Sequence, residues 1–301
     1  MKRFKRYLPI YLMMLPGALY LLINNYLPMF GLVIAFKNIN FRKGIFGSDW
    51  VGFKNFEYLF NSTDAWIITR NTLLYNIAFI ILGIIVGVGC GILLNEIKKK
   101  IWMRFFQTAI LLPHLLSWVI ISYFTYAMLS ESTGMLNKSI LPFFGMDSIN
   151  WFSEPKFWPF ILIIMNVWKG FGFSTIVYFS SIVGISPDYY EAAMLDGASR
   201  WKQIRNITLP LIKPTVITLF LLNVGRIFYS DFGLFLQVPM NSGMLFSTTN
   251  VIDTYVYRSL IQVGNVGMSA AAGFYQSIVG FVMVIGANAL VRKISNDDAL
   301  F

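Results

Sequence analysis

The sequence has little charge and almost no cysteine. Only 13% of its 301 residues are charged, whereas a soluble domain carries about 25%. Hydrophobic residues make up 56%, and the mean hydropathy is +0.63. The single cysteine, Cys90, excludes an internal disulfide framework and a cysteine-rich metal site. The excess of apolar residues must face lipid, and it therefore predicts an all-α polytopic membrane protein.

The motifs of ATPases and of common catalysts are also missing. No G-x-x-x-x-G-K-[ST] phosphate loop is present, so the sequence shows no ATP site of its own. The only histidine, His114, follows Pro113 in an apolar run and is expected to fill a kinked, partly polar position. We therefore expect a protein that is not an enzyme and that binds no cofactor or metal itself.

Six apolar runs are long enough for the roughly 20 residues that a membrane-spanning helix needs. Prolines inside them, Pro113 among them, predict kinks. Gly83, Gly87 and Gly91 recur every four residues, which indicates close helix packing on one face. The first run is too long for the apolar part of a cleavable signal peptide, so we expect it to remain as a span. The six predicted spans are 9–36, 73–95, 105–129, 157–185, 215–238 and 271–291.

Positive charge predicts the orientation of these spans. If the N-terminus is cytoplasmic, fourteen of the 24 Lys and Arg residues lie in inner segments and eight in outer ones, while Lys169 and Arg226 fall within spans. This inner excess predicts that both termini and the loop 186–214 lie in the cytoplasm. The net charge of +10 does not indicate nucleic acid, because the basic residues cluster at the ends of apolar runs, as membrane anchors do.

The loop 186–210 carries the local signals of two short helices. Ser186 and Ser199 are suitable N-caps, and Gly197 supplies a left-handed stop between the helices. Pro210 and Pro214 are expected to end the second helix before the next span. The result would be a slim helix–turn–helix that can seat in a groove of a partner protein.

The order of residues in this loop resembles the EAA motif of bacterial ABC-importer permeases, although Ile204 stands where the family often has an aromatic residue. The resemblance implies a MetI-like type I importer permease fold, in which this loop is the coupling helix that docks into a cleft of a cytoplasmic ATPase. An ordinary amphipathic loop is the alternative. The residues implied to couple are Glu191, Ala192, Ala193, Asp196, Gly197, Ala198, Ile204, Ile207, Leu209 and Pro210.

Further segments resemble the carbohydrate-uptake class of these permeases, closest to its subgroup for oligosaccharides and polysaccharide fragments. The resemblance implies a bacterial cell-membrane protein that forms a heterodimer with a second permease, together with two ATPase subunits and an extracytoplasmic solute-binding protein or lipoprotein. It also implies a five-helix permease core at 70–292, after a tail, first span and outer loop at 1–69 and before a cytoplasmic tail at 293–301. The matching segments are 15–17, 26–29, 31–37, 50–56, 94–96, 112–114 and 251–258.

Polar residues inside spans predict where a substrate passes, since such residues are costly in lipid and usually line a cavity or pair. On a helix, Asn166, Lys169, Gly170 and Phe173 share one face. This stretch resembles the sugar-contacting segment of the maltose-importer membrane subunit, from which Lys169 departs. Its ammonium either favours an acidic or heavily hydroxylated glycan or pairs internally.

The predicted fifth span adds a second, weaker group of candidates for substrate contact. Asn223 and Arg226 are three residues apart, which places them on neighbouring parts of a helix surface. Asp231 follows in the same predicted span. The alternative is a structural network in which Asp231 or a partner helix satisfies Arg226.

Two other functions compete with an ATP-driven importer. A secondary, ion-coupled transporter predicts acidic relay residues inside spans and inverted repeats, but the sequence offers only Asp231 and no evident repeat. A membrane enzyme of glycan or lipid synthesis needs a cluster of carboxylates or histidines near an interface, and none is evident. An ATPase gene beside this one would separate the importer from both.

Overall fold

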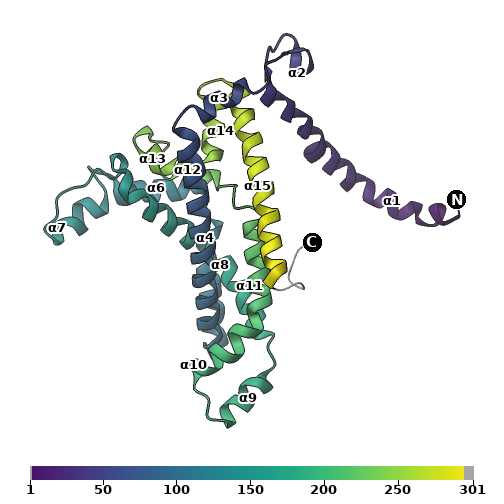
Figure 1. The fold of residues 1–301 in the computed structure, drawn as a ribbon. Coiled ribbons are helices and arrows are strands. Elements are labelled where there is room, and N and C mark those ends of the chain that lie inside the picture. Colours follow the sequence, from purple (N-terminus) through teal and green to yellow (C-terminus); the bar gives the residue numbers. More distant parts are fainter. Residues whose placement is uncertain (1, 295–301) are drawn as a thin grey trace. The chain divides into compact units, whose positions relative to one another are not determined.

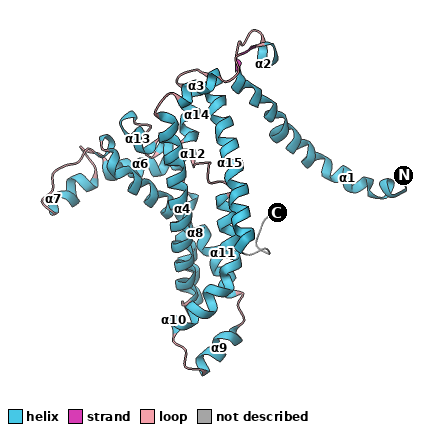
Figure 2. Ribbon diagram, viewed as in Figure 1, coloured by secondary structure: helices cyan, strands magenta, loops and turns pink. Residues whose placement is uncertain are grey.

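The computed structural model describes residues 2–294, most of which are helical (Figures 1 and 2). Two helices, α5 (Lys100–Leu115) and α6 (Trp118–Leu129), are apolar enough to form one span together but are bent by 93° at the break between them. The described residues thus give five spans, or six with this broken one, in an all-α polytopic membrane protein as predicted. The five are Tyr7–Phe36, Asp64–Asn95, Pro155–Val183, Arg200–Val224 and Val266–Ala289.

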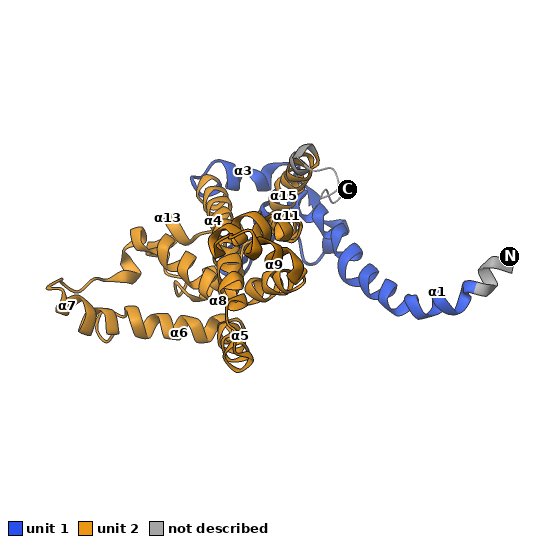
Figure 3. Ribbon diagram, turned by 90° about the horizontal axis from the view of Figure 1, so that it is seen from below, with its two compact units in different colours: residues 1–65, 255–275 blue, residues 66–254, 276–301 orange. Residues whose placement is uncertain are grey.

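The chain divides into two compact units (Figure 3). Unit 1 comprises residues 1–65 and 255–275, and unit 2 comprises residues 66–254 and 276–301. The first stretch of unit 1 contains the start of eight elements: α1 (Lys2–Leu21), η1 (Leu22–Tyr26), η2 (Leu27–Phe36), β1 (Lys37–Asn38), α2 (Gly44–Gly47), β2 (Asp49–Trp50), α3 (Lys54–Phe60) and α4 (Asp64–Asn95). Most of α14 (Ile252–Ile261) lies in the second stretch.

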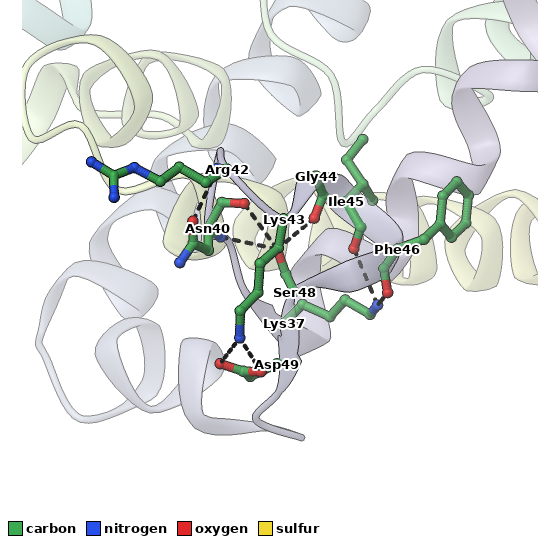
Figure 4. Close-up of polar contacts among 9 residues, drawn as sticks. All are labelled: Lys37, Asn40, Arg42, Lys43, Gly44, Ile45, Phe46, Ser48 and Asp49. Atoms are coloured by element: carbon green, nitrogen blue, oxygen red, sulfur yellow. Dashed lines mark hydrogen bonds and ion pairs between the residues drawn. The ribbon is translucent and has the colours of Figure 1, made fainter.

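A small antiparallel hairpin follows the first span in unit 1, with Lys37 opposite Trp50. The ammonium of Lys37 is buried and donates to the carbonyls of Ile45, at 3.1 Å, and Phe46, at 2.8 Å (Figure 4). These two bonds satisfy carbonyls at the end of α2 that have no partner within so short a helix. Side-chain bonds to the backbone therefore close the loop between the two strands.

Most spans contribute to unit 2, whose core gathers large side chains from several helices. Trp158 at the start of α8 is fully buried and donates from its indole to the carbonyl of Trp151, at 2.7 Å. Tyr75 and Phe235 pack edge to face, 4.9 Å apart. The remaining elements of the chain are η3 (Leu136–Ile140), α7 (Leu141–Phe143), η4 (Trp151–Ser153), η5 (Pro155–Phe157), α8 (Trp158–Val183), α9 (Pro187–Leu195), α10 (Arg200–Gln203), η6 (Ile204–Thr208), α11 (Leu209–Val224), α12 (Phe232–Gln237), η7 (Gly243–Leu245), α13 (Phe246–Thr249) and α15 (Val266–Ile294).

Two predicted spans differ from the observed ones. The run 105–129 is not one straight helix, because Pro113 ends the regular bonding of α5 and Ser117 caps a new helix by accepting from the N–H of Ile120 at 3.3 Å. The predicted span 215–238 also has the wrong bounds, since the helical span begins at Arg200 and ends at Val224. Residues 225–231 form a turn before α12, so Arg226 lies beyond the span.

Glycines let α8 approach its neighbours at backbone distance. A Cβ added to Gly87 of α4 would lie 3.0 Å from the ring of Tyr178, and one on Gly91 would lie 3.2 Å from the backbone of Phe179. The predicted packing role of these two glycines is therefore confirmed, whereas Gly83 has open space around it. On the other side of α8, a Cβ at Gly172 would overlap the carbonyl of Ile110 in α5.

We expect Gly172→Ala to force α5 and α8 apart, because the obstructing atom is backbone and cannot move aside. Overpacking of this kind costs about 1–3 kcal/mol, which a lowered melting temperature of the purified protein would report. Gly170→Ala is the matched control in the same helix, since nothing lies within 4 Å of its added Cβ. Equal melting temperatures for the two variants would contradict this packing.

Candidate functional site

The loop predicted to couple forms two short helices joined by a tight turn. We call residues 186–208 the coupling loop. Ser186 caps α9 by accepting from the N–H of Asp188 at 3.4 Å, and Ser199 caps α10. Gly197 has a φ of +73°. The N–H groups after the turn bond back into α9, from Gly197 to Met194 at 3.0 Å and from Ala198 to Ala193 at 2.9 Å, which is the pattern of a glycine C-cap.

Side-chain bonds hold the parts of the coupling loop to one another. Tyr190 shares a hydrogen bond with Thr208 at 2.9 Å, and Gln203 donates to the carbonyl of Ala198 at 3.1 Å. A cleft of about 340 Å³ beside them is bordered by Glu191 and Ile204 and by the last residues of α4 and α8. The loop therefore sits where α4 and α8 end, as Figure 1 shows.

The second helix of the loop does not stop before the span, contrary to the prediction. Residues 200–224 form one continuous helical span. Ile204–Thr208 is a π-helical segment directly before α11, whose second residue is Pro210. A π-helical turn changes the bonding pattern where proline lacks an N–H and its ring crowds a preceding carbonyl. Pro214 is likewise carried inside α11.

The predicted coupling residues differ in how far they reach solvent. Leu195 and Trp201, which lie beside members of the predicted set but do not belong to it, are 90% and 69% exposed. Ile204 is half-buried and borders the cleft rather than the outer surface. Of the predicted set, the exposed members are Glu191, Ala192, Asp196, Gly197, Leu209 and Pro210, and the half-buried ones are Ala193, Ala198, Ile204 and Ile207.

A cavity of about 750 Å³ lies among α4, α8 and α11, and we call it the central cavity. It brings together residues from both groups of substrate candidates predicted on separate spans. The ring of His114 stacks on that of Phe173, with centroids 5.7 Å apart. The predicted residues that line it are Asn166, Gly170, Phe173, Asn223, Arg226 and Asp231.

Lys169 is the exception, because it does not line the central cavity. Its ammonium donates to the carbonyl of His114, at 2.9 Å, and to the carbonyl of Leu116. The carbonyl of His114 lies in the last turn of α5, and that of Leu116 lies in the break between α5 and α6. The ammonium also lies 5.3 Å from the centre of the Trp118 ring, within cation–π range. Of the two roles left open by the sequence, the structure shows internal pairing.

Asp231 is also occupied within the protein. The indole N–H of Trp118 donates to its Oδ2 at 2.7 Å, and its Oδ1 accepts from the backbone N–H of Gly233 at 3.0 Å, which caps α12. A Cβ on Gly233 would overlap the ring of Trp118. The carboxylate thus fixes α6 against α12, and Arg226 has no ion pair with it among the described residues.

The free polar groups of the central cavity are therefore few. Within residues 2–294, the guanidinium of Arg226 and the amide of Asn166 have no recorded side-chain hydrogen bond, and Asn223 uses only its N–H group, toward the carbonyl of Leu219 at 2.8 Å. Arg226 is exposed to the cavity at the end of α11. One free cation with amides and aromatic rings suits a polar ligand that carries negative charge.

Sequence reasoning missed the side chains that shape the turn 225–231. Asn76 in α4 donates to the carbonyls of Ile227, at 2.9 Å, and Tyr229. Asp253 accepts from the N–H of Ser230 at 2.8 Å, and burial raises the pKa of its carboxyl. Their partners lie far away in sequence, so no local pattern marks them. Trp118 had a local signal, since Ser117 directly before it is a good N-cap.

The chain is similar to known transport proteins over nearly its whole length. The family described as "Binding-protein-dependent transport system inner membrane component" matches residues 80–296. Protein LplB of Bacillus subtilis is 33% identical over 288 residues, which cover 96% of this chain and 90% of LplB. The polygalacturonan/rhamnogalacturonan transport system permease protein YteP of the same organism is 34% identical over 293 residues, which cover 96% of this chain and 89% of YteP.

Solved structures show the same likeness in three dimensions. A chain in the crystal structure of a bacterial ABC transporter involved in the import of the acidic polysaccharide alginate superposes with a TM-score of 0.88 at 34% identity, covering 98% of each chain. A chain in the structure of a bacterial alginate ABC transporter in complex with an alginate pentasaccharide-bound periplasmic protein gives a TM-score of 0.87 at 33% identity, covering 98% of this chain and 97% of the other.

We expect Lys169→Met to destabilise the protein, because the carbonyls at the helix break lose a charged donor inside the membrane. Hydrogen bonds to charged groups contribute about 1.5–3 kcal/mol each. The melting temperature and the uptake of neutral and acidic substrates should fall together, whereas Lys169→Arg should retain both because a guanidinium can also donate to two carbonyls. An unchanged melting temperature with loss of acidic substrates alone would instead make Lys169 a substrate contact.

Substitutions at Gly197 separate backbone strain from contact with a partner. Nothing lies within 4 Å of an added Cβ here, and a left-handed residue other than glycine costs about 1–2 kcal/mol. Gly197→Asn should keep the turn, because asparagine tolerates this conformation, while adding a side chain to the surface. We expect Gly197→Asn and Gly197→Asp both to assemble but to lose substrate-stimulated ATP hydrolysis. Normal coupling in both variants would show that nothing packs on this turn.

Proposed function

This chain belongs to the family of binding-protein-dependent transport system inner membrane components, as a permease subunit of an ABC importer and not an enzyme, and we propose that it carries oligosaccharides or polysaccharide fragments through the central cavity. The observation that supports this substrate class most directly is the composition of the cavity wall. Amides, stacked aromatic rings and one free guanidinium converge on a space of about 750 Å³. This mixture suits a bulky, hydroxylated ligand better than a small ion.

The substrate is proposed to be an acidic glycan. Arg226 is the free cation of the central cavity within the described chain, and its planar fork matches a carboxylate. Lys169, which the sequence offered for this role, is bonded to backbone carbonyls instead. Two similar proteins fit this class, since one belongs to a transporter involved in the import of the acidic polysaccharide alginate and the other is a polygalacturonan/rhamnogalacturonan permease, whereas other relatives are named for neutral sugars such as maltodextrin.

The coupling loop is proposed to dock on a separate cytoplasmic ATPase, which binds ATP and Mg²⁺. Leu195 is exposed and the turn at Gly197 carries no side chain, and both features support a close protein contact there. Since this loop lies at the cytoplasmic end in our proposal, both termini are cytoplasmic and the permease core spans 70–292. ATP binding would close two ATPase subunits, move the loop and open the central cavity outward by alternating access.

The remaining partners are proposed from the exposed faces of the chain. The central cavity is open on one side, where Phe173 is 59% exposed and Leu222 is 54% exposed. A second, homologous permease would close this side in a heterodimer, and lipid would cover the outer faces of the spans. An extracytoplasmic solute-binding protein or lipoprotein would deliver the oligosaccharide to the far end from the coupling loop.

An ion-coupled secondary transporter is disfavoured by the family and by the state of Asp231. A relay carboxylate has to exchange protons or ions with the cavity. Asp231 holds the indole of Trp118 and the first turn of α12 through both of its oxygens. It therefore acts as a structural cap, which leaves ATP hydrolysis by another subunit as the energy source.

Arg226→Gln tests the substrate class. Binding of trigalacturonate to the purified transporter complex, measured by calorimetry without the binding protein, should weaken by about tenfold to a hundredfold, as expected for a charged hydrogen bond. The carboxyl-reduced trisaccharide, which has no charge, should bind the unmodified complex and the Arg226→Gln complex with equal affinity. Lys213→Gln removes a cation of α11 that does not line the cavity, and it should change neither affinity.

Two results would contradict the proposal for different reasons. Equal loss of the charged and the reduced trisaccharide in Arg226→Gln would mean that the guanidinium supports structure or a partner helix. Uptake that continues without ATP and the binding protein would contradict the importer itself.

A further inference from the structure

A second pocket in unit 2 lies among the segments that follow α6 and α12. Its volume is about 670 Å³. The last turns of α6, the segment 130–152 and the turn after α12 form its walls. Because this region adjoins the start of α8, whereas the coupling loop adjoins the end of α8, the pocket lies at the opposite end of the unit from that loop. We call it the loop pocket.

Aromatic rings and free polar groups line the loop pocket together. The rings of Tyr126 and Phe152 lie 5.8 Å apart at an angle of 50°. The side chains of Lys138, Ser148 and Asn150, and the carboxylate of Glu131, make no side-chain hydrogen bond or ion pair within residues 2–294. Rings with adjustable donors and acceptors beside them suit a ligand with apolar ring faces and many hydroxyls.

The wall of the loop pocket is held rigidly from behind by Asn137. This side chain is 3% exposed and makes four hydrogen bonds. It donates to the carbonyls of Ser130, at 3.1 Å, and Ile149, at 2.9 Å, and it accepts from the N–H of Ile149 and from the indole of Trp151. A wall fixed in advance lowers the ordering cost of binding.

The backbone is strained at 240–241, on the side of the loop pocket opposite Asn137. Met240, which lines the pocket, has a φ of 53°, and Asn241 has a φ of 49°. Non-glycine residues in this left-handed region cost free energy and gather at functional sites. The hydroxyl of Ser242 donates to the carbonyl of Phe152 at 3.2 Å, which connects this segment to the side of the pocket that holds the aromatic rings.

Two elements lead from the loop pocket to the central cavity. Helix α6 starts at Trp118, bonded to Asp231 of the cavity, and ends at Leu129, beside the loop pocket. Helix α12 starts at Phe232, which lines the cavity, and ends three residues before Met240. At 1.5 Å per residue, α6 is about 18 Å long. Tyr126, which lines the loop pocket, is eight residues from Trp118, or about 12 Å along the helix, a distance that an oligosaccharide of several residues can bridge.

We propose that the loop pocket is a second glycan subsite, which holds one part of an acidic oligosaccharide while another part enters the central cavity. This inference rests on the proposed function of the chain. The rings of Tyr126 and Phe152 contact a sugar face, and the ammonium of Lys138 pairs with a uronate carboxylate. Glu131 also lines the loop pocket, and its carboxylate accepts hydrogen bonds from sugar hydroxyls beside the uronate that Lys138 holds. The import of long substrates depends on both subsites, and that of disaccharides on the central cavity alone.

The length dependence of uptake tests this subsite. Proteoliposomes with the complete importer and its binding protein are supplied with digalacturonate or hexagalacturonate. In Tyr126→Ala and Lys138→Gln, the KM for the hexasaccharide should rise by about tenfold, the factor that corresponds to one lost contact of about 1.4 kcal/mol. The KM for the disaccharide should stay unchanged, which also shows that both variants fold and couple.

Matched controls come from the same region of the chain. Tyr123→Ala alters an exposed tyrosine of α6 outside the loop pocket, and Lys156→Gln removes a lysine that pairs with Glu154. Neither should change the KM for either length. Equal loss of both lengths in Tyr126→Ala would make the pocket a docking surface for a protein partner and overturn the subsite. An unchanged KM for the hexasaccharide in Tyr126→Ala and Lys138→Gln would also overturn the subsite. An unmodified importer that transports neither digalacturonate nor hexagalacturonate would instead contradict the proposed function on which the subsite rests.

Discussion

A helix can break inside a membrane only if other groups bond the carbonyls that the break leaves free. Lys169 meets this requirement between α5 and α6, with its ammonium on two carbonyls and beside the ring of Trp118. The 93° bend that results turns α6 away from the direction of α5. The bond from Trp118 to Asp231, which caps α12 and lines the central cavity, depends on this bend.

One helix of unit 2 connects the coupling loop with the central cavity. Residues 200–224 run without interruption from the coupling loop to the central cavity. The π-helical segment before Pro210 carries the helix past a residue that would otherwise disturb its bonding. Because Asn223 lies in the last turn and Arg226 just beyond it, a movement of the loop along this helix would directly reach these two proposed substrate contacts.

Local signals predicted local structure well. The caps at Ser186 and Ser199 and the left-handed turn at Gly197 follow from neighbouring residues alone, and the structure has them. The shared face of Asn166, Gly170 and Phe173 follows from helical periodicity, and these residues line one cavity. Their contact with a glycan stays a prediction.

Sequence reasoning failed where the decisive partner is distant or where a turn is apolar. The carbonyls bonded to Lys169 lie 53 and 55 residues away in the chain. Hydropathy did not show the break at Leu116 or the end of the span at Val224, because apolar residues continue past both. The most direct test is a structure of the assembled importer with trigalacturonate bound. The account predicts a uronate carboxylate on Arg226, with Lys169 still on the carbonyls of His114 and Leu116. A carboxylate on Lys169, or Arg226 paired with an acid of the second permease, would contradict it.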